Sequence, residues 1–79
     1  MENKIKLVWR FSGINALQIA DHHLVHINEY SEKENLKIIN SGTQEINEFS
    51  SISFIIISKD IFNKIKNDLK PHHSFIVKD

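Results

Sequence analysis

Apolar residues follow two different spacings along this chain, and the order of these spacings restricts the fold more than any other feature. In residues 4–11 every second side chain is apolar, as a strand with one buried face requires. Residues 14–32 contain neither proline nor glycine and repeat apolar side chains at helical spacing, which predicts a long amphipathic helix. Ser12–Gly13 lies between the two segments, and we expect it to supply the N-terminal cap of the helix.

The rest of the chain is predicted to contain three further strands and one more helix. Residues 54–57 are apolar on both faces, which is typical of a central strand of a sheet. The predicted segments are, in order, a half-polar extended segment (36–46) with a bulge or bend at Ser41–Gly42, a turn (47–50), a strand (51–58), a helix (59–70) between Ser58 and Pro71, and a short strand (73–77).

The resulting order is strand, helix, strand, strand, helix, strand, within a single predicted domain of residues 1–79. With right-handed crossovers this order is most economically satisfied by a four-stranded antiparallel sheet with both helices on one face. The chain therefore resembles the ferredoxin-like α+β superfold over its whole length. The stretch WRFSGINALQIADHHLVHINEY also resembles short uncharacterised bacterial proteins. Neither resemblance implies an activity, because this superfold carries many unrelated functions.

The composition excludes several classes of function. There is no cysteine, so disulfides, thiolate metal sites and thiol nucleophiles are ruled out, and a reducing compartment is favoured. Ten basic and ten acidic residues are interspersed, so we expect no binding to nucleic acid or to a membrane surface. No apolar run approaches the ~20 residues of a membrane span, and the alternating N-terminus is unlike a signal peptide. A cytoplasmic location is expected.

The sheet face that the helices leave uncovered is the predicted interaction surface. We expect the helices to cover the face that carries Leu7, Trp9, Phe54 and Ile56. A contiguous apolar patch on the other face predicts a homodimer with two-fold symmetry, because pairing would bury the patch. Arg10 within it would then need a partner, either Glu45 or a carboxylate ligand held between subunits. The patch is expected to consist of Val8, Ile39, Ile55, Ile57 and Ile76.

Three histidines in the first helix are expected to have different environments. His23 lies on the apolar face of the helix, where a neutral core histidine is favoured over a base or ligand that faces a pocket. His22 and His26 are four residues apart and therefore neighbours on one flank, where two imidazoles can reach one metal ion. Only Glu29 is a good third ligand nearby, so we expect no cofactor and no physiological metal site, and only weak binding of zinc or nickel.

The last two histidines, His72 and His73, precede the final strand and are expected to lie beside the start of the first helix. Free backbone N–H groups at a helix N-terminus bind anions, and Gly13 would let a ligand approach the backbone closely. The pair together with Ser12 and Gly13 therefore forms a candidate site for a small anion.

These patterns favour a small dimeric domain that binds a ligand or a partner protein without catalysis. One alternative is an enzyme that uses histidine acid–base chemistry at the corner formed by Ser12, Gly13, His72 and His73. The other alternative is metal binding through His22 and His26. The candidate ligand-binding residues are Arg10, Ser12, Gly13, His23, His72 and His73, and no catalytic residue is assigned.

Overall fold

The computed structural model describes residues 4–77 and has the predicted order of elements. A single 3₁₀ turn, Lys59–Ile61, follows directly after the third strand, and the side chain of Ser58 accepts a hydrogen bond from its second residue, Asp60 (3.4 Å). The elements are β1 (Lys4–Ser12), α1 (Ala16–Lys33), β2 (Ile38–Asn47), β3 (Ser50–Ser58), α2 (Phe62–Leu69) and β4 (His73–Val77).

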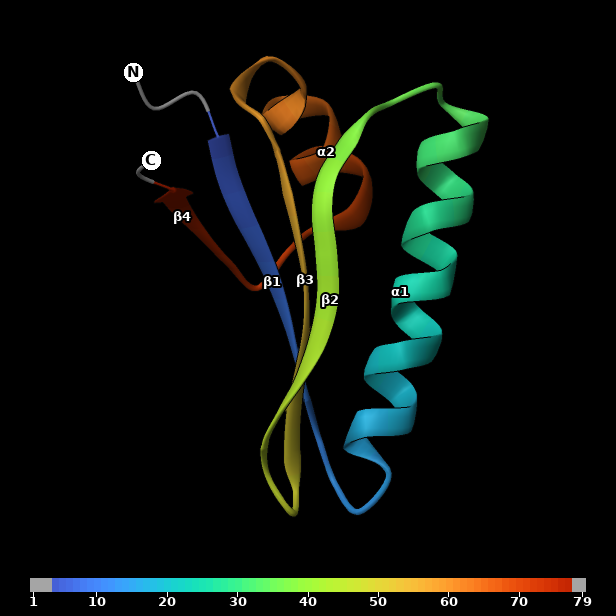
Figure 1. Ribbon diagram of the computed structural model, residues 1–79, viewed down its shortest axis with the longest axis vertical. Helices are drawn as coiled ribbons and strands as arrows, with labels where there is room; N and C mark the ends of the chain where they lie inside the picture. Colours follow the sequence, from blue (N-terminus) through green and yellow to red (C-terminus); the bar gives the residue numbers. More distant parts are fainter. Residues whose placement is uncertain (1–3, 78–79) are drawn as a thin grey trace.

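The four strands form one antiparallel sheet in the order β2-β3-β1-β4 (Figure 1). The strand with apolar residues on both faces, β3, is central, as its sequence predicts. The edge strand β4 pairs with only part of β1, from Val77 opposite Lys4 to His73 opposite Val8. The last four residues of β1 therefore extend beyond β4 and pair only with β3.

Both helices pack on the same face of the sheet, so the fold is ferredoxin-like. Ile27 of α1 and Ile65 of α2 are almost fully buried in one cluster with side chains of β1 and β3. Trp9 anchors this cluster and is 3% exposed, and its Nε1 donates a hydrogen bond to the carbonyl oxygen of Leu69 (3.0 Å). The buried cluster contains Ile5, Leu7, Trp9, Ile27, Ile55, Ile57 and Ile65.

The face assignment of β3 differs from the sequence-based expectation by one residue. Ile55 pairs with Leu7 and Ile57 pairs with Ile5, so both lie under the helices and are fully buried. Phe54 and Ile56 lie on the uncovered face, where the opposite was expected. All four positions are apolar, so polarity alone cannot choose the phase of this strand.

Small side chains account for the observed phase. At its start β3 buries Ser51 (1% exposed) and Ser53 (0%) on the covered face, while α1 buries Ala16 and Ala20. The helix contacts β3 more extensively than any other strand. Small residues on both elements allow a helix and a strand to approach closely, and burying Ser51 and Ser53 places every second residue of β3 on the same side.

The two glycines have roles other than those predicted. Gly13 has φ +113°, a conformation that L-residues rarely adopt, and its N–H donates to the carbonyl oxygen of Phe49 (2.8 Å). The residue before α1 is Asn15, without a side-chain cap, so the predicted cap at Ser12–Gly13 is wrong. Strand β2 is continuous through Gly42, and its bulges lie on either side, between Ile38 and Asn40 and between Glu45 and Asn47.

Gly42 instead provides room for an aromatic ring. A Cβ atom at this position would lie 3.1 Å from two ring carbons of Phe54, the residue that pairs with Gly42 in the neighbouring strand. The glycine thus lets the Phe54 ring pack closely against the backbone of β2 on the uncovered face.

The short helix α2 is connected to α1 by polar contacts at one end of the molecule. The hydroxyl of Tyr30 donates a hydrogen bond to Asp68, and Lys64 forms ion pairs with Glu34 (3.1 Å) and Asp68 (3.2 Å). The Lys70 residue adopts a left-handed conformation (φ 49°) and ends α2 directly before Pro71. Within residues 4–77, neither helix has the length and apolarity needed to cross a bilayer.

Candidate functional site

The uncovered face of the sheet has a half-open hollow near its centre, with a volume of about 270 Å³. Val8 (6% exposed) and Ile52 form its apolar floor, because both side chains point away from the helices. All four strands contribute to the lining. The lining residues are Lys6, Val8 and Arg10 of β1, Ile46 of β2, Ile52 of β3, and His73 and Phe75 of β4.

The polar groups of this hollow are basic. Lys6 and Arg10 lie on the same face of β1, on either side of Val8, and His73 lies opposite Val8 on that face. None of the lining residues is acidic. Among residues 5–77, the four strands contain a single acidic residue, Glu45. It pairs with the buried Ser51 and therefore belongs to the helix-covered face. The hollow therefore combines positive charge with an apolar floor.

The basic side chains of the hollow have no acidic partner within residues 4–77. The Lys6 ammonium lies over the ring of Phe54, 4.6 Å from its centroid, which is a cation–π contact. The guanidinium of Arg10 forms no ion pair with a described residue, so the suggested pairing with Glu45 does not occur within the subunit. Arg10 is exposed, and its charge is available to an anion from outside the chain.

His72 holds the edge of the sheet next to the hollow. Its backbone N–H donates to the carbonyl oxygen of Val8 (3.0 Å), and its ring Nδ1 accepts a hydrogen bond from the backbone N–H of Arg10 (2.9 Å). The imidazole acts as the hydrogen-bond acceptor for the Arg10 N–H at a point where a longer β4 would supply a backbone carbonyl. It therefore fixes the backbone that carries Arg10, and its Nδ1 must carry no proton while it does so.

The predicted corner of Ser12, Gly13, His72 and His73 does not form. Because β4 starts opposite Val8, the two histidines lie four residues before the end of β1. Ser12 pairs instead with Ser50, and Gly13 contacts the β2–β3 turn through Phe49. The predicted corner required β4 to begin where β1 ends, whereas β4 is too short to reach that point.

His23 faces the sheet, as the helical wheel predicts, and is half-buried. Its ring meets the rings of Trp9 and Phe11 edge-on, with centroids 5.1 Å and 5.3 Å apart. Its Nε2 is buried and has no hydrogen-bond partner within residues 4–77. Desolvation lowers the pKa of His23, and the nearby His26 and His72 lower it further, so the neutral form is favoured.

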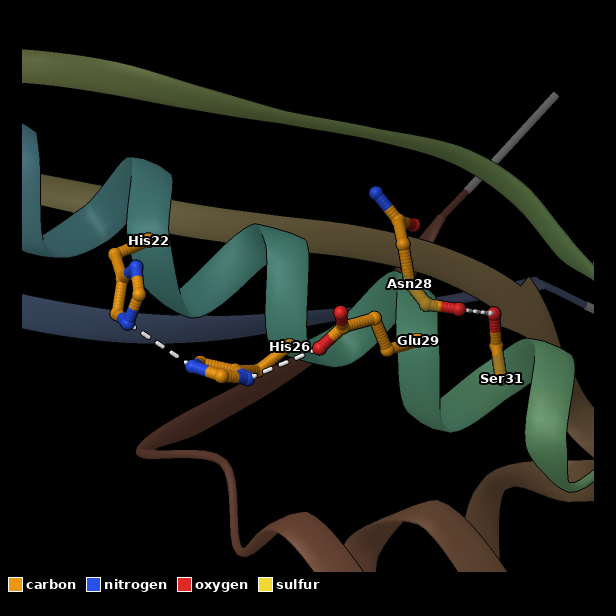
Figure 2. A network of polar contacts seen from close by, with 5 residues as sticks. All are labelled: His22, His26, Asn28, Glu29 and Ser31. Atoms are coloured by element: carbon orange, nitrogen blue, oxygen red, sulfur yellow. Dashed lines mark hydrogen bonds and ion pairs between the residues drawn. The ribbon is translucent and has the colours of Figure 1, made fainter.

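His22 and His26 lie next to each other on the exposed flank of α1, as their spacing predicts (Figure 2). Their Nε2 atoms are 3.0 Å apart, and Nδ1 of His26 lies 3.2 Å from Oε1 of Glu29. Glu29 thus approaches the ring nitrogen of His26 that faces away from His22, where it orients the imidazole and does not converge on a shared ion.

This flank provides two converging nitrogen ligands, whereas stable zinc sites use three or four protein ligands. Within residues 4–77 no group of three or more potential metal ligands is brought together. One turn further along α1, Ser31 donates to the carbonyl oxygen of Asn28 (2.8 Å), a contact that belongs to the helix alone (Figure 2). The expected weak binding of zinc or nickel by His22 and His26 stays a prediction, which elemental analysis of untagged protein would check.

Of the predicted ligand-binding residues, the structure brings Arg10 and His73 together in one hollow, with His72 behind Arg10. Sequence reasoning missed Lys6 and Phe75, although both belong to the same alternation as Arg10 and His73. It also missed Ile52, because its phase for β3 was wrong, and it placed Ile76 on this face, although Ile76 pairs with Ile5 on the helix-covered side. Comparisons with protein-family models, with curated proteins and with solved structures found no match to this chain.

Proposed function

We propose that this protein is a non-catalytic binding domain for a small ligand that carries an anionic group on an apolar body. The observation that supports this proposal is the composition of the hollow, where Lys6, Arg10 and His73 surround an apolar floor without any acidic residue. The absence of cysteine supports a reducing compartment, and we assign this function to the cytoplasm.

The chemistry of the lining residues defines the class of ligand. A guanidinium group binds carboxylate or phosphate through two parallel hydrogen bonds, so Arg10 suits a planar or tetrahedral oxyanion. Val8, Ile52 and Phe75 offer apolar surface to the rest of the ligand. The volume of about 270 Å³ lies just below the roughly 300–1,000 Å³ of typical ligand pockets, so the ligand is small.

Binding without catalysis is the better supported function of this site. A general acid or base must lie within hydrogen-bonding distance of a reacting group and be protected from water. The hollow is half open, and its one imidazole, that of His73, is exposed and stacks on Phe75 (centroids 6.2 Å apart). The catalytic corner considered as an alternative lacks its geometry, because Ser12 and Gly13 lie away from His72 and His73.

Calorimetric titration with phenyl phosphate tests the proposal, because this probe joins a dianion to an apolar ring. Benzyl alcohol carries the ring without the charge, and inorganic phosphate carries the charge without the ring. We expect phenyl phosphate to bind more tightly than either control compound. Amide resonances of β1 and β4 should shift on binding while those of the outer flank of α1 stay in place.

Arg10→Gln should weaken binding of phenyl phosphate by about tenfold or more, since a hydrogen bond to a charged group contributes about 1.5–3 kcal/mol. Lys59→Gln removes the same charge from an exposed position outside the hollow and serves as the matched control. Equal affinity of the wild-type protein and the Arg10→Gln variant, or equal binding of benzyl alcohol and phenyl phosphate, would contradict the proposal.

A further inference from the structure

We propose that a second copy of this chain completes the ligand site, so that two uncovered sheet faces pair only when an anionic ligand lies between them. This inference rests on the proposed function and adds the partner that the site requires. It changes the expected homodimer in two respects, the residues at the interface and the condition under which it forms.

The hollow of one subunit is incomplete as a binding site. A bound small molecule usually has 70–90% or more of its surface buried, whereas a half-open hollow on an uncovered sheet face leaves one side of the ligand in water. No loop or helix of the described chain covers this face, because α1 and α2 both pack on the opposite one. A second sheet face placed over the first would enclose the ligand.

The surroundings of the hollow are suited to such a contact. Phe75 is 55% exposed and Ile46 is 48% exposed, and they line the hollow from the two edge strands. Phe54 and Ile56 of the central strand lie half-buried between them on the same face. These four side chains give the uncovered face apolar surface on β2, β3 and β4, and two-fold pairing would bury it on both copies at once.

The charges on this face oppose pairing in the absence of a ligand. A two-fold axis through the hollow brings Lys6 and Arg10 of one copy against the same residues of the other. No acidic side chain from residues 5–77 of the four strands lies on this face to neutralise them. Like charges brought together out of water oppose association, so the anion of the ligand supplies the charge that the interface lacks.

Sedimentation velocity of the full chain tests this inference, in a buffer free of phosphate and sulfate. The wild-type protein should sediment as a monomer alone and as a dimer at the phenyl phosphate concentration that saturates it in calorimetry. Benzyl alcohol at the same concentration should leave it monomeric.

Two matched variants separate pairing from binding. Ile56→Lys adds a charge to the uncovered face outside the residues that line the hollow, and it should still bind phenyl phosphate but stay monomeric. Ile19→Lys adds the same charge to an exposed position of α1 and should dimerise like the wild type. Circular dichroism of both variants establishes that they are folded.

The outcomes distinguish this inference from the proposed function. A monomer with phenyl phosphate bound would overturn ligand-coupled pairing and leave the binding function standing. A dimer already present without phenyl phosphate would overturn the coupling alone. Absence of any heat of binding and of any resonance shift would overturn both. Dimerisation of the Ile56→Lys variant with the probe would show that another surface forms the interface.

Discussion

Single residues of the same type serve different purposes in this protein, and its five histidines are the clearest case. His72 accepts a backbone hydrogen bond at the edge of the sheet, and His73 lines the hollow on the uncovered face. His23 is half-buried between α1 and the sheet, with its ring against Trp9 and Phe11. Burial and neighbouring groups, which follow from the fold, decide the role of each imidazole.

His23 is expected to make the stability of the protein depend on pH. Its pKa in the folded protein is lowered from 6.5, first by desolvation and then by His26 and His72, so the unfolded chain binds more protons below neutral pH. The stabilising contribution of neutral His23 is therefore complete above about pH 6.5 and is lost as the pH falls through the lowered folded pKa.

His23→Leu should remove this dependence and be neutral or slightly stabilising at pH 7, because the buried Nε2 has no hydrogen-bond partner within residues 4–77. Urea unfolding of the wild-type and variant proteins at several pH values between 5 and 8 measures the difference in free energy. A variant that loses more than about 1 kcal/mol at pH 7 would indicate that the imidazole forms a hydrogen bond.

At the scale of elements, the phase of β3 determines which residues form the core and which form the binding surface. Ile55 is fully buried under the helices, whereas its neighbour Ile56 lies half-buried on the uncovered face. Two adjacent isoleucines therefore give a direct comparison with the same substitution.

Ile55→Lys should destabilise the protein by about 3–5 kcal/mol or more, because it places an unpaired charge in the core. That is a large part of the roughly 5–15 kcal/mol that stabilises a typical domain, so much of this variant should be unfolded. Ile56→Lys should stay folded, since the lysine can extend into water from the uncovered face. Circular dichroism and thermal unfolding compare the two, and a reversed order would mean that β3 has the opposite phase.

In the molecule as a whole, α2 is a short helix that a few specific contacts hold on the sheet. Its Ile65 is buried in the core, and polar contacts fix its position. These are the Trp9–Leu69 hydrogen bond, the Tyr30–Asp68 hydrogen bond and the ion pair between Lys64 and Glu34. Desolvation of the phenol, followed by the hydrogen bond to Asp68, raises the pKa of Tyr30 to about 12. Tyr30 thus donates its proton throughout the physiological range.

Tyr30→Phe should loosen α2 while leaving the sheet intact. The phenylalanine keeps the aromatic packing of Tyr30 against the core but cannot donate to Asp68, so one of the contacts between the helices is lost. Amide hydrogen exchange should become faster in residues 62–69 than in β1 and β3, with a small loss of overall stability. Asn63→Ala, at an exposed position of the same helix, is the control. Unchanged exchange in α2 would show that its other contacts hold it without the Tyr30–Asp68 hydrogen bond.

The order of the elements and the antiparallel ferredoxin-like sheet could be predicted from the sequence, because both follow from the local spacing of apolar residues and from the rules of chain connection. The sequence also predicted that Trp9 faces the helices and that His22 and His26 are neighbours. The phase of β3 could not be predicted, because residues 54–57 are apolar on both faces and the phase depends on small side chains packed under α1. The same holds for the position of His73. Because β4 begins opposite Val8, His73 lines the hollow with Lys6 and Arg10 and does not lie beside Gly13. Pairing between strands distant in sequence depends on the packing of the whole chain, which no local pattern of residues specifies.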